Sequence, residues 1–181
     1  SLNELPTKNL FGCEVNLTFY SKAIHKFKTK YNVDISSNFH NIDFFSMPER
    51  KFDIVVGNPP WANFNDLPQL YKESLKPLFI EYGLVNNSKD LLLGGSRIDI
   101  SALVIQRAIQ NFLSNKGKGF FFLPLSLLLN DGAHSTFRRF KCTNEVFSIT
   151  KVFDFNDLDI FDGVSTRNGL AAIVKNKPQT Y

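Results

Sequence analysis

Four consecutive residues, Asn58-Pro59-Pro60-Trp61, have side chains and backbone groups suited to chemistry on an amine. They directly follow the apolar run Asp53-Ile54-Val55-Val56-Gly57, which predicts a strand that is buried on both faces. The tetrapeptide would then lie at the carboxyl end of a strand, the edge at which open α/β sheets bind ligands. Chance would produce Asn-Pro-Pro-aromatic only about 0.005 times in a chain of this composition, which disfavours an ordinary turn.

The tetrapeptide matches what methylation of an exocyclic amine requires. The nitrogen of such an amine is a poor nucleophile because its lone pair is conjugated with the ring. The Asn58 side-chain oxygen can accept one amine hydrogen, and a carbonyl within Asn58-Pro59, with that of Pro59 favoured, can accept the other. Pro59 and Pro60 have a fixed φ and no N–H donor, so the acceptors are oriented before substrate arrives. Trp61 offers a face on which a base can stack, a contact worth roughly 1–3 kcal/mol.

Strand and helix patterns alternate along the chain, which predicts an α/β fold with a mostly parallel sheet and helices on both faces. The predicted strands are 10–15, a segment ending at 41–45, 52–56, 119–123, 150–155 and 170–174. The predicted helices are 17–30, 69–82, 99–113, with a cap at Asp99, and 126–140, interrupted at Gly132. Residues 62–98 are interpreted as an inserted loop and helical excursion, and long insertions of this kind tend to be functional.

Composition and charge limit the classes of function that this chain can have. The chain has 181 residues, of which 43% are hydrophobic, and this predicts one globular domain with a sizeable core. No apolar run is long enough to span a bilayer, and no signal peptide is visible, so we expect a cytoplasmic protein without a membrane partner. Cys13, Cys142 and three scattered histidines lack metal-ligand spacing. A net charge of +4 is compatible with a polyanionic partner, although the lysine clusters are more typical of solvated faces.

On these motifs the chain resembles adenine-specific amino DNA methyltransferases of the γ-like motif order, found in large restriction-modification and phage-defence proteins. The resemblance implies a Rossmann-like core that binds S-adenosylmethionine and transfers its methyl group to adenine in DNA. Phe11-Gly12-Cys13-Glu14-Val15-Asn16 resembles the family's second motif, in which Glu14 would accept hydrogen bonds from the cofactor's ribose. Asn41-Ile42-Asp43-Phe44-Phe45 resembles the third motif. There Asp43 would accept from the cofactor's adenine amine and Phe44 would pack on its ring, while Asn58 borders the same cofactor.

A looser resemblance concerns the second aromatic face of the base pocket. Ile160-Phe161, followed by the run 165–172, is similar to the family's eighth motif. There an aromatic residue, here Phe161, stacks on the face of the flipped base opposite to Trp61. A target inside duplex DNA must leave the stack to be reached, and two aromatic faces recover part of that cost. A core role for Phe161 stays open, because the chain has 19 phenylalanines.

One expected motif has no counterpart. The family begins its cofactor site with a glycine-rich turn between a strand and a helix, and Gly12 is the only glycine in the first 50 residues. We therefore expect residues 1–181 to be a partial catalytic domain that lacks this first strand-turn unit and the target-recognition domain. The remainder of the parent polypeptide would then be a required partner for full cofactor binding and for sequence specificity.

Two other classes of function stay open. Methyltransferases that act on RNA adenine or on protein glutamine share the Asn-Pro-Pro-aromatic pattern, although Trp61 and the insertion after it favour a large DNA enzyme. The chain could alternatively be a non-catalytic scaffold or DNA-binding module of a defence complex. The missing glycine-rich turn favours that reading for this chain, and the intact tetrapeptide argues against it for the parent protein.

Overall fold

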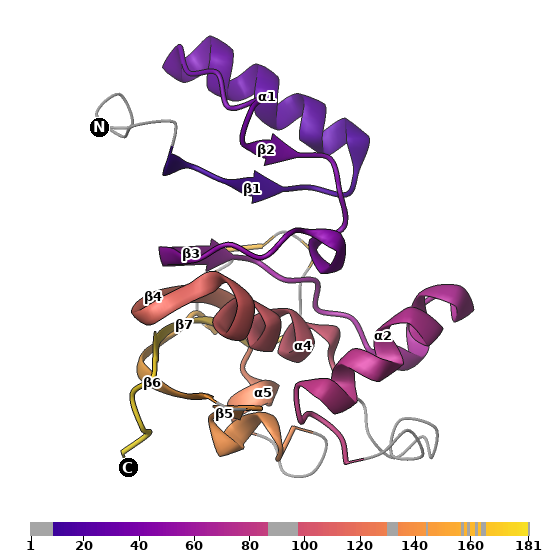
Figure 1. The fold of residues 1–181 in the computed structure, drawn as a ribbon, viewed down its shortest axis with the longest axis vertical. Helices are drawn as coiled ribbons and strands as arrows, with labels where there is room; N and C mark the ends of the chain where they lie inside the picture. The colour runs from indigo at the N-terminus through magenta and orange to yellow at the C-terminus, as the bar shows by residue number, and fades with distance from the viewer. Residues whose placement is uncertain are drawn as a thin grey trace. The chain divides into compact units, whose positions relative to one another are not determined.

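The computed structural model describes residues 9–86, 98–129, 134–143, 145–156, 158, 160, 161, 163 and 166–180. The chain divides into two compact units, Ser1–Pro48 and Glu49–Tyr181, which are described in turn. Figure 1 shows the ribbon with its elements labelled.

The first unit is a strand-helix-strand arrangement. Its elements are β1 (Gly12–Cys13), α1 (Leu17–Tyr31), β2 (Phe39–His40) and the 3-10 turn η3 (Phe44–Ser46). Strands β1 and β2 pair in parallel, and α1 connects them. The helix begins after Asn16, whose side chain accepts from the backbone N–H groups of Thr18 and Phe19. The predicted helix over 17–30 is therefore confirmed.

Both strands of this unit are shorter than predicted, because side chains take over the hydrogen bonding where the strands were expected to continue. The Asn41 amide donates to the Glu14 carbonyl at 2.8 Å and to the Val15 carbonyl at 3.0 Å. Beyond it, the Asp43 carboxylate accepts from the Phe45 N–H at 2.7 Å and caps η3. The segment 41–45 is thus a capped turn after β2 and does not form the end of a strand.

The second unit contains a mixed five-stranded sheet in the order β3-β4-β7-β6-β5. Its strands are β3 (Phe52–Gly57), β4 (Leu113–Pro124), β5 (Lys141–Cys142), β6 (Glu145–Asp154) and β7 (Asn168–Lys175). Its helical elements are η4 (Phe64–Asp66), α2 (Gln69–Glu81), α4 (Ile100–Arg107), η5 (Ala108–Phe112), α5 (Ser126–Leu129) and η6 (Phe137–Arg139). The α/β class is as predicted.

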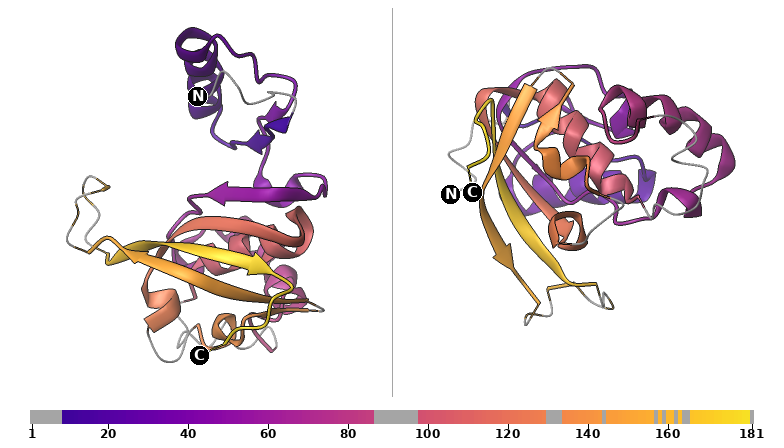
Figure 2. Two further views of the ribbon diagram at one scale, coloured as in Figure 1. Left: turned by 90° about the vertical axis from the view of Figure 1, so that its left-hand side faces the viewer. Right: turned by 90° about the horizontal axis from the view of Figure 1, so that it is seen from below.

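The direction of the strands differs from the prediction of a mostly parallel sheet. Strand β3 pairs with β4 in parallel, whereas the pairs β4–β7, β6–β7 and β5–β6 are all antiparallel. Figure 2 shows β6 and β7 running side by side. Consecutive strands that pair antiparallel need no crossover helix between them, which is why the strand-helix alternation of the first half does not continue.

The exposure of β3 differs most clearly from what the sequence predicted. The apolar run was expected to be covered on both faces, but Ile54 is 62% exposed and Val56 is 71% exposed. The reason is its position in the sheet, because among the described residues β3 pairs with β4 alone and forms the sheet's edge. A strand with one neighbour keeps part of its backbone and side chains in solvent.

Helix α4 and the π-helical turn η5 fill the core of the second unit. Ala102, Leu103, Ile105 and Ile109 are fully buried. The predicted helix 99–113 is confirmed with Asp99 as its cap, but its end differs from the prediction. The chain passes from Phe112 directly into β4, so Gly117 and Gly119 lie inside a strand.

Two lysines explain how this helix ends without a glycine. The last carbonyls of a helix lack intrahelical donors and need other partners. Lys51 donates to the Gln110 carbonyl at 2.6 Å, and Lys175 donates to the Gln110 and Leu113 carbonyls at 3.1 and 3.0 Å. The buried Lys175 ammonium is paired with Glu145 at 2.6 Å.

The prediction of a single helix over 126–140 is wrong. The structure has the short helix α5 and the 3-10 turn η6, and Phe140 takes a left-handed φ of 51°. Gly132, the expected interruption, lies outside the described residues. Helix α2, strand β6 and strand β7 agree with their predicted positions, although both strands are longer than predicted.

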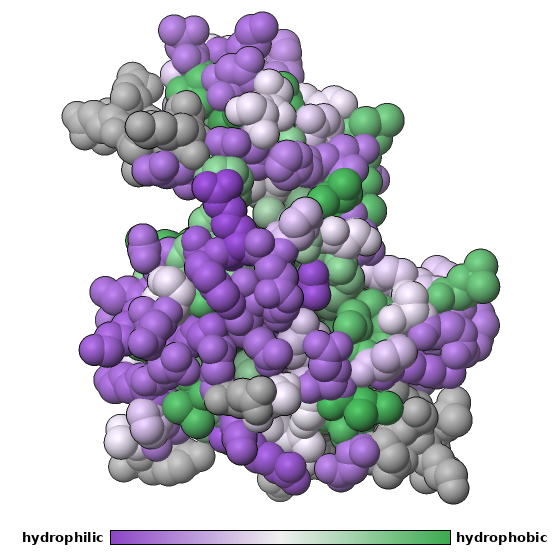
Figure 3. Space-filling model, viewed as in Figure 1, coloured by the Kyte–Doolittle hydropathy of each residue, from purple (hydrophilic) through white to green (hydrophobic). Residues whose placement is uncertain are grey.

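The surface of the second unit is largely polar on the face drawn in Figure 3, with apolar side chains gathered beside α2. Leu70 on that helix is 88% exposed. None of the helices in the described part of the chain is long and apolar enough to cross a membrane.

We expect Gly169→Ala to lower the free energy of unfolding by about 1–3 kcal/mol, the usual cost of overpacking. A Cβ at this position would lie 2.4 Å from the Phe153 carbonyl oxygen, a backbone atom that cannot move away without breaking the β6–β7 ladder. Gly57→Ala is the matched control, because its Cβ would meet only the Phe121 ring at 3.5 Å. Urea unfolding of the three proteins measures the effect, and equal stability of the two variants would contradict it.

Candidate active site

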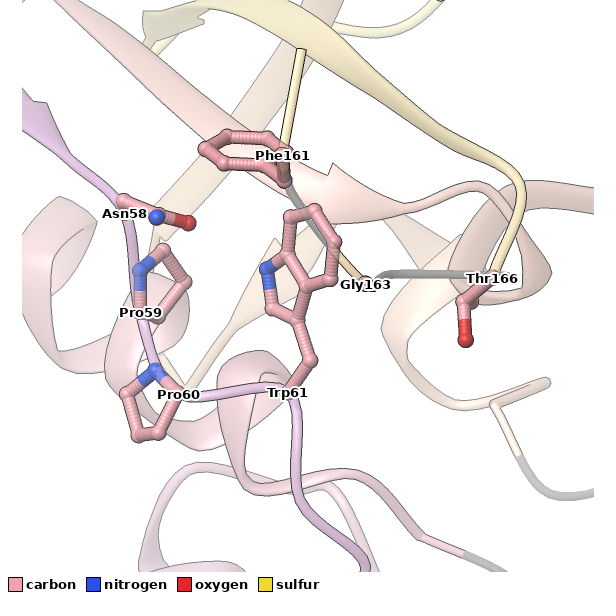
Figure 4. A pocket seen from close by; sticks show the side chains of 7 residues that line it. All are labelled: Asn58, Pro59, Pro60, Trp61, Phe161, Gly163 and Thr166. Atoms are coloured by element: carbon pink, nitrogen blue, oxygen red, sulfur yellow. The ribbon is translucent and has the colours of Figure 1, made fainter. Parts of the chain in front are cut away.

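The loop Asn58-Pro59-Pro60-Trp61 follows β3 directly and lines an open pocket of about 460 Å³. The other lining residues are Phe161, Gly163 and Thr166. In Figure 4 the Asn58 carboxamide and the Trp61 indole ring face the same space, with the Phe161 ring beside the indole. The pocket has the size of ordinary small-molecule sites, roughly 300–1,000 Å³.

The loop is held at both ends by backbone hydrogen bonds. Before it, β3 pairs with β4 up to the partners Gly57 and Phe121. After it, Asn63 forms an antiparallel bridge with Asp99, in which the Phe64 N–H donates to the Ile98 carbonyl at 2.8 Å. The Ile100 N–H donates to the Ala62 carbonyl at 2.9 Å in the same bridge. The four residues of the loop thus span two fixed points of the second unit.

Side-chain packing reinforces the second fixed point. Phe64 is 3% exposed and packs edge to face on Phe79 of α2, with ring centroids 5.2 Å apart. Pro59, within the loop, is also buried, whereas Asn58 and Pro60 are exposed. The Asn58 carboxamide is therefore presented to the pocket by a backbone that is anchored on both sides.

An aromatic cluster forms the other wall of the pocket. Phe161 packs edge to face on Trp61, with ring centroids 5.3 Å apart and an interplanar angle of 87°. It also packs edge to face on Phe122 of β4, at 5.4 Å and 83°. The structure therefore places Phe161 in contact with Trp61, whereas the family resemblance implied that the two rings lie on opposite faces of a base. The two rings touch at right angles, so in this arrangement no slot for a planar base lies between them.

Trp61 has one polar atom that the protein leaves without a partner. The indole Nε1 is buried, and no acceptor lies within hydrogen-bond reach among the described residues. A buried donor without an acceptor is costly, so a small rotation of the ring or a bound molecule that supplies an acceptor would be favourable.

The first unit brings together two of the expected cofactor-binding residues. Glu14 follows β1 and Asp43 follows β2, so both carboxylates lie beyond the carboxyl ends of two adjacent parallel strands. Both lie near the Cys13 thiol. Burial, and then the negative charges of Asp43 and Glu14, raise the pKa of Cys13 to about 11. This thiol is therefore protonated at neutral pH.

Each carboxylate is oriented by the local backbone. The Asn16 N–H donates to Glu14 Oε1 at 2.7 Å, and the Phe45 N–H donates to Asp43 Oδ1 at 2.7 Å. A carboxylate has about four lone-pair sites, so one such bond fixes its orientation and does not exhaust its capacity as an acceptor. Phe44 is half-buried and packs edge to face on Phe45 at 5.7 Å.

The predicted residues thus fall into two groups. Glu14, Asp43 and Phe44 belong to the first unit, whereas the Asn58 loop and Phe161 belong to the second. Sequence reasoning did not assign Thr166, Phe122 or Asp99 to the site, although Asp99 was expected to be a helix cap. Within the described ranges, no three His, Cys, Asp or Glu side chains are grouped so that they could hold a metal ion.

Comparison with known proteins identifies the family. The sequence matches the Eco57I restriction-modification methylase family over residues 7–161. The chain belongs to this family. This confirms the resemblance at the level of restriction-modification methylases, while the γ-like, adenine-specific subdivision stays a prediction. A comparison with curated proteins gives no match.

A solved structure supports the fold of this family member. The chain is similar to the methyltransferase subunit of a type I restriction-modification system from Streptococcus thermophilus, with a TM-score of 0.62 and 20% sequence identity. The match covers 92% of this chain and 34% of that subunit, so the chain spans about a third of the subunit's length. The likeness confirms the Rossmann-like methyltransferase fold.

We expect Phe161→Ala to make Trp61 more accessible to solvent, because it removes the ring that packs on the indole. Trp61 is the single tryptophan of the chain, so quenching of intrinsic fluorescence by acrylamide reports on this residue alone. Phe155→Ala is the control, because Phe155 contacts Phe122 at 5.9 Å. Equal quenching in the two variants would contradict the contact between Phe161 and Trp61.

Proposed function

We propose that the polypeptide to which this chain belongs is a DNA adenine methyltransferase of a restriction-modification or defence system. It transfers a methyl group from S-adenosylmethionine to the exocyclic amino group of adenine. The observation that carries the proposal is the anchored Asn58-Pro59-Pro60-Trp61 loop, which lines a pocket at the carboxyl end of β3. The family match supports DNA as the substrate over RNA adenine or protein glutamine, and it supports an enzyme over a scaffold.

Asn58 and Pro59 activate the amine in this proposal. The Asn58 Oδ1 atom accepts one amine hydrogen and the Pro59 carbonyl accepts the other, which localises the lone pair on the nitrogen. Because the loop is fixed on both sides, these acceptors are already placed when the base arrives. Preorganised acceptors act most strongly where water is excluded, and the pocket is open with Asn58 exposed, so the incoming base itself has to displace the water around them.

Trp61 and Phe161 hold the extruded base. The edge-to-face pair fills part of the pocket, so Phe161 must move before a base can lie against the Trp61 face. Stacking on aromatic faces recovers part of the energy needed to unstack the base from the duplex. The same movement would also allow the buried Trp61 Nε1 to donate a hydrogen bond to an acceptor.

Glu14, Asp43 and Phe44 hold the cofactor. S-adenosylmethionine, when bound, supplies an electrophilic methyl group on a sulfonium. The residues fit this ligand because two backbone-oriented carboxylates follow adjacent parallel strands, where ribose hydroxyls and an adenine amine can be accepted. The half-buried Phe44 ring lies directly after Asp43 and offers an apolar surface for the adenine.

We further propose that a strand from elsewhere in the polypeptide pairs with β3 and brings the glycine-rich turn of the cofactor site. The support is the edge position of β3, together with the exposure of its apolar residues Ile54 and Val56. Unpaired edges with exposed apolar side chains invite association with another strand. Target recognition would also lie in the part of the polypeptide outside these 181 residues.

Asn58→Ala in the full polypeptide should lower the rate of methyl transfer by about 10²–10³, the usual effect of losing one preorganised transition-state contact. Cofactor binding should change much less, because the main task of Asn58 is to orient the amine. The exposed Asn65 is the control position, and its alanine variant should keep the wild-type rate. Single-turnover transfer to DNA and calorimetric cofactor titration measure the two effects. A rate within about tenfold of wild type would contradict the role of Asn58.

The 181-residue chain alone should bind S-adenosylmethionine weakly or not at all, although Glu14, Asp43 and the Asn58 loop are present. Backbone N–H groups of a glycine-rich turn normally let the cofactor approach the sheet closely, and Gly12 is the only glycine in the first 50 residues of this chain. Calorimetry of the purified chain, with the full polypeptide as the positive control, measures the difference. Micromolar binding by the chain itself would show that its cofactor pocket is complete.

A further inference from the structure

Two polar groups in the wall of the pocket have complementary needs. The Trp61 Nε1 atom is a buried donor, and the described residues supply no acceptor for it. The Asn58 carboxamide is exposed, and no hydrogen bond to a described residue holds it. In Figure 4 the Nε1 edge of the indole is turned toward Asn58 and Pro59, and the carboxamide oxygen of Asn58 points to the side on which the indole lies. A donor without an acceptor thus faces an acceptor without a donor.

The carboxamide of Asn58 must be oriented before it can serve an amine. An asparagine side chain carries an acceptor oxygen at one end and a donor NH2 group at the other. The amine that is methylated also donates, so only the oxygen can accept its hydrogen, and the NH2 end would place donor against donor. A carboxamide without partners can present either end. The site therefore needs a donor that selects the orientation with Oδ1 toward the amine.

The indole N–H of Trp61 is suited to this task. The Asn58 Oδ1 atom has two lone pairs, so it can accept from the indole and keep one lone pair for an amine hydrogen. The Pro59 carbonyl is less suited, because it belongs to a backbone that β3–β4 pairing and the bridge between Asn63 and Asp99 hold in place. The Asn58 carboxamide can instead turn about its side-chain bonds to meet the indole.

Phe161 holds the indole away from this bond in the structure described here. Its ring packs edge to face on Trp61 at 5.3 Å and on Phe122 at 5.4 Å, which restricts the turning of the indole. When Phe161 moves for an incoming base, the indole is free to turn. The N–H lies in the plane of the indole ring, so its hydrogen bond leaves the face of the ring available for stacking.

We propose that the Trp61 N–H is a positioning group, which donates to Asn58 Oδ1 once Phe161 has moved and thereby turns this oxygen toward the amine. The inference rests on the proposed function and gives Trp61 a second role beside stacking. It also accounts for tryptophan at this position, because phenylalanine offers a stacking face without a donor, and the hydroxyl of tyrosine lies at the far end of its ring.

A kinetic comparison in two backgrounds tests the proposal. In the full polypeptide, Trp61→Phe should lower the single-turnover rate of methyl transfer about 3- to 10-fold, the usual effect of losing one hydrogen bond, and leave the affinity for S-adenosylmethionine unchanged. In the Asn58→Asp background the same change should have little effect, because both oxygens of a carboxylate accept and no orientation has to be selected. Phe161→Leu is the matched control. It removes an aromatic contact but no donor, so its effect should be the same in both backgrounds.

The two backgrounds separate positioning from other roles of the indole. An equal effect of Trp61→Phe in both overturns the proposal, because the N–H would then act on the base or on Pro59, or only stacking would have been lost. A wild-type rate in Trp61→Phe overturns it as well. If the Asn58→Asp protein transfers no methyl group, the spectroscopic test below decides.

The NMR signal of the indole N–H tests the contact without reference to catalysis. Trp61 is the only tryptophan of the 181-residue chain, so isotope-labelled tryptophan gives a single indole signal. Adding adenosine should move the proton signal downfield, because a hydrogen bond forms, and Asn58→Ala should lack this downfield shift. The exposed Asn65 is the matched control position, and its alanine variant should behave as wild type.

The spectroscopic result also separates this inference from the proposed function. A signal that does not move downfield in wild type, or that moves as far in Asn58→Ala, overturns the positioning role. If the wild-type polypeptide transfers no methyl group while adenosine moves the signal only when Asn58 is present, the proposed function fails and the positioning role stands.

Discussion

The candidate site depends on one constraint, which is that backbone hydrogen bonds hold the Asn58-Pro59-Pro60-Trp61 loop at both ends. The pairing of β3 with β4 fixes the backbone before Asn58, and the bridge between Asn63 and Asp99 fixes it after Trp61. Two prolines in the middle leave few backbone angles to vary. The acceptors that the proposed function assigns to Asn58 and Pro59 are therefore placed by the fold and not by the substrate. The buried helix α4 matters to the site because it carries one of the two anchors.

Local chemistry predicted the features that depend on a few neighbouring residues. The position of the loop after a strand, the helix that begins after Asn16 and the cap at Asp99 all follow from residue types at adjacent positions. The fold class followed from the order of these elements, and the solved methyltransferase subunit confirms it. Glu14 directly follows β1 as expected, whereas Asp43 lies in the capped turn after β2, and the role of both residues toward a cofactor stays a prediction.

The incorrect predictions concern features decided by distant residues. Glycines 117 and 119 suggested a helix end, but pairing with β3 and β7 extends β4 over both of them. Lys51 and Lys175 donate to the Gln110 carbonyl at the end of the helix instead, from 59 and 65 residues away in sequence. The apolar run of β3 suggested burial on two faces, but burial depends on the neighbours a strand has in the sheet.

The central claim is that the pocket presents acceptors to the exocyclic amine of adenine. The most direct measurement is mass spectrometry of nucleosides from DNA that was incubated with the full polypeptide and S-adenosylmethionine carrying an isotope-labelled methyl group. The account predicts label in N6-methyladenine, and its loss in the Asn58→Ala protein. Label in a ring carbon of cytosine would contradict the account, because Asn58 and Pro59 offer nothing to activate a carbon nucleophile.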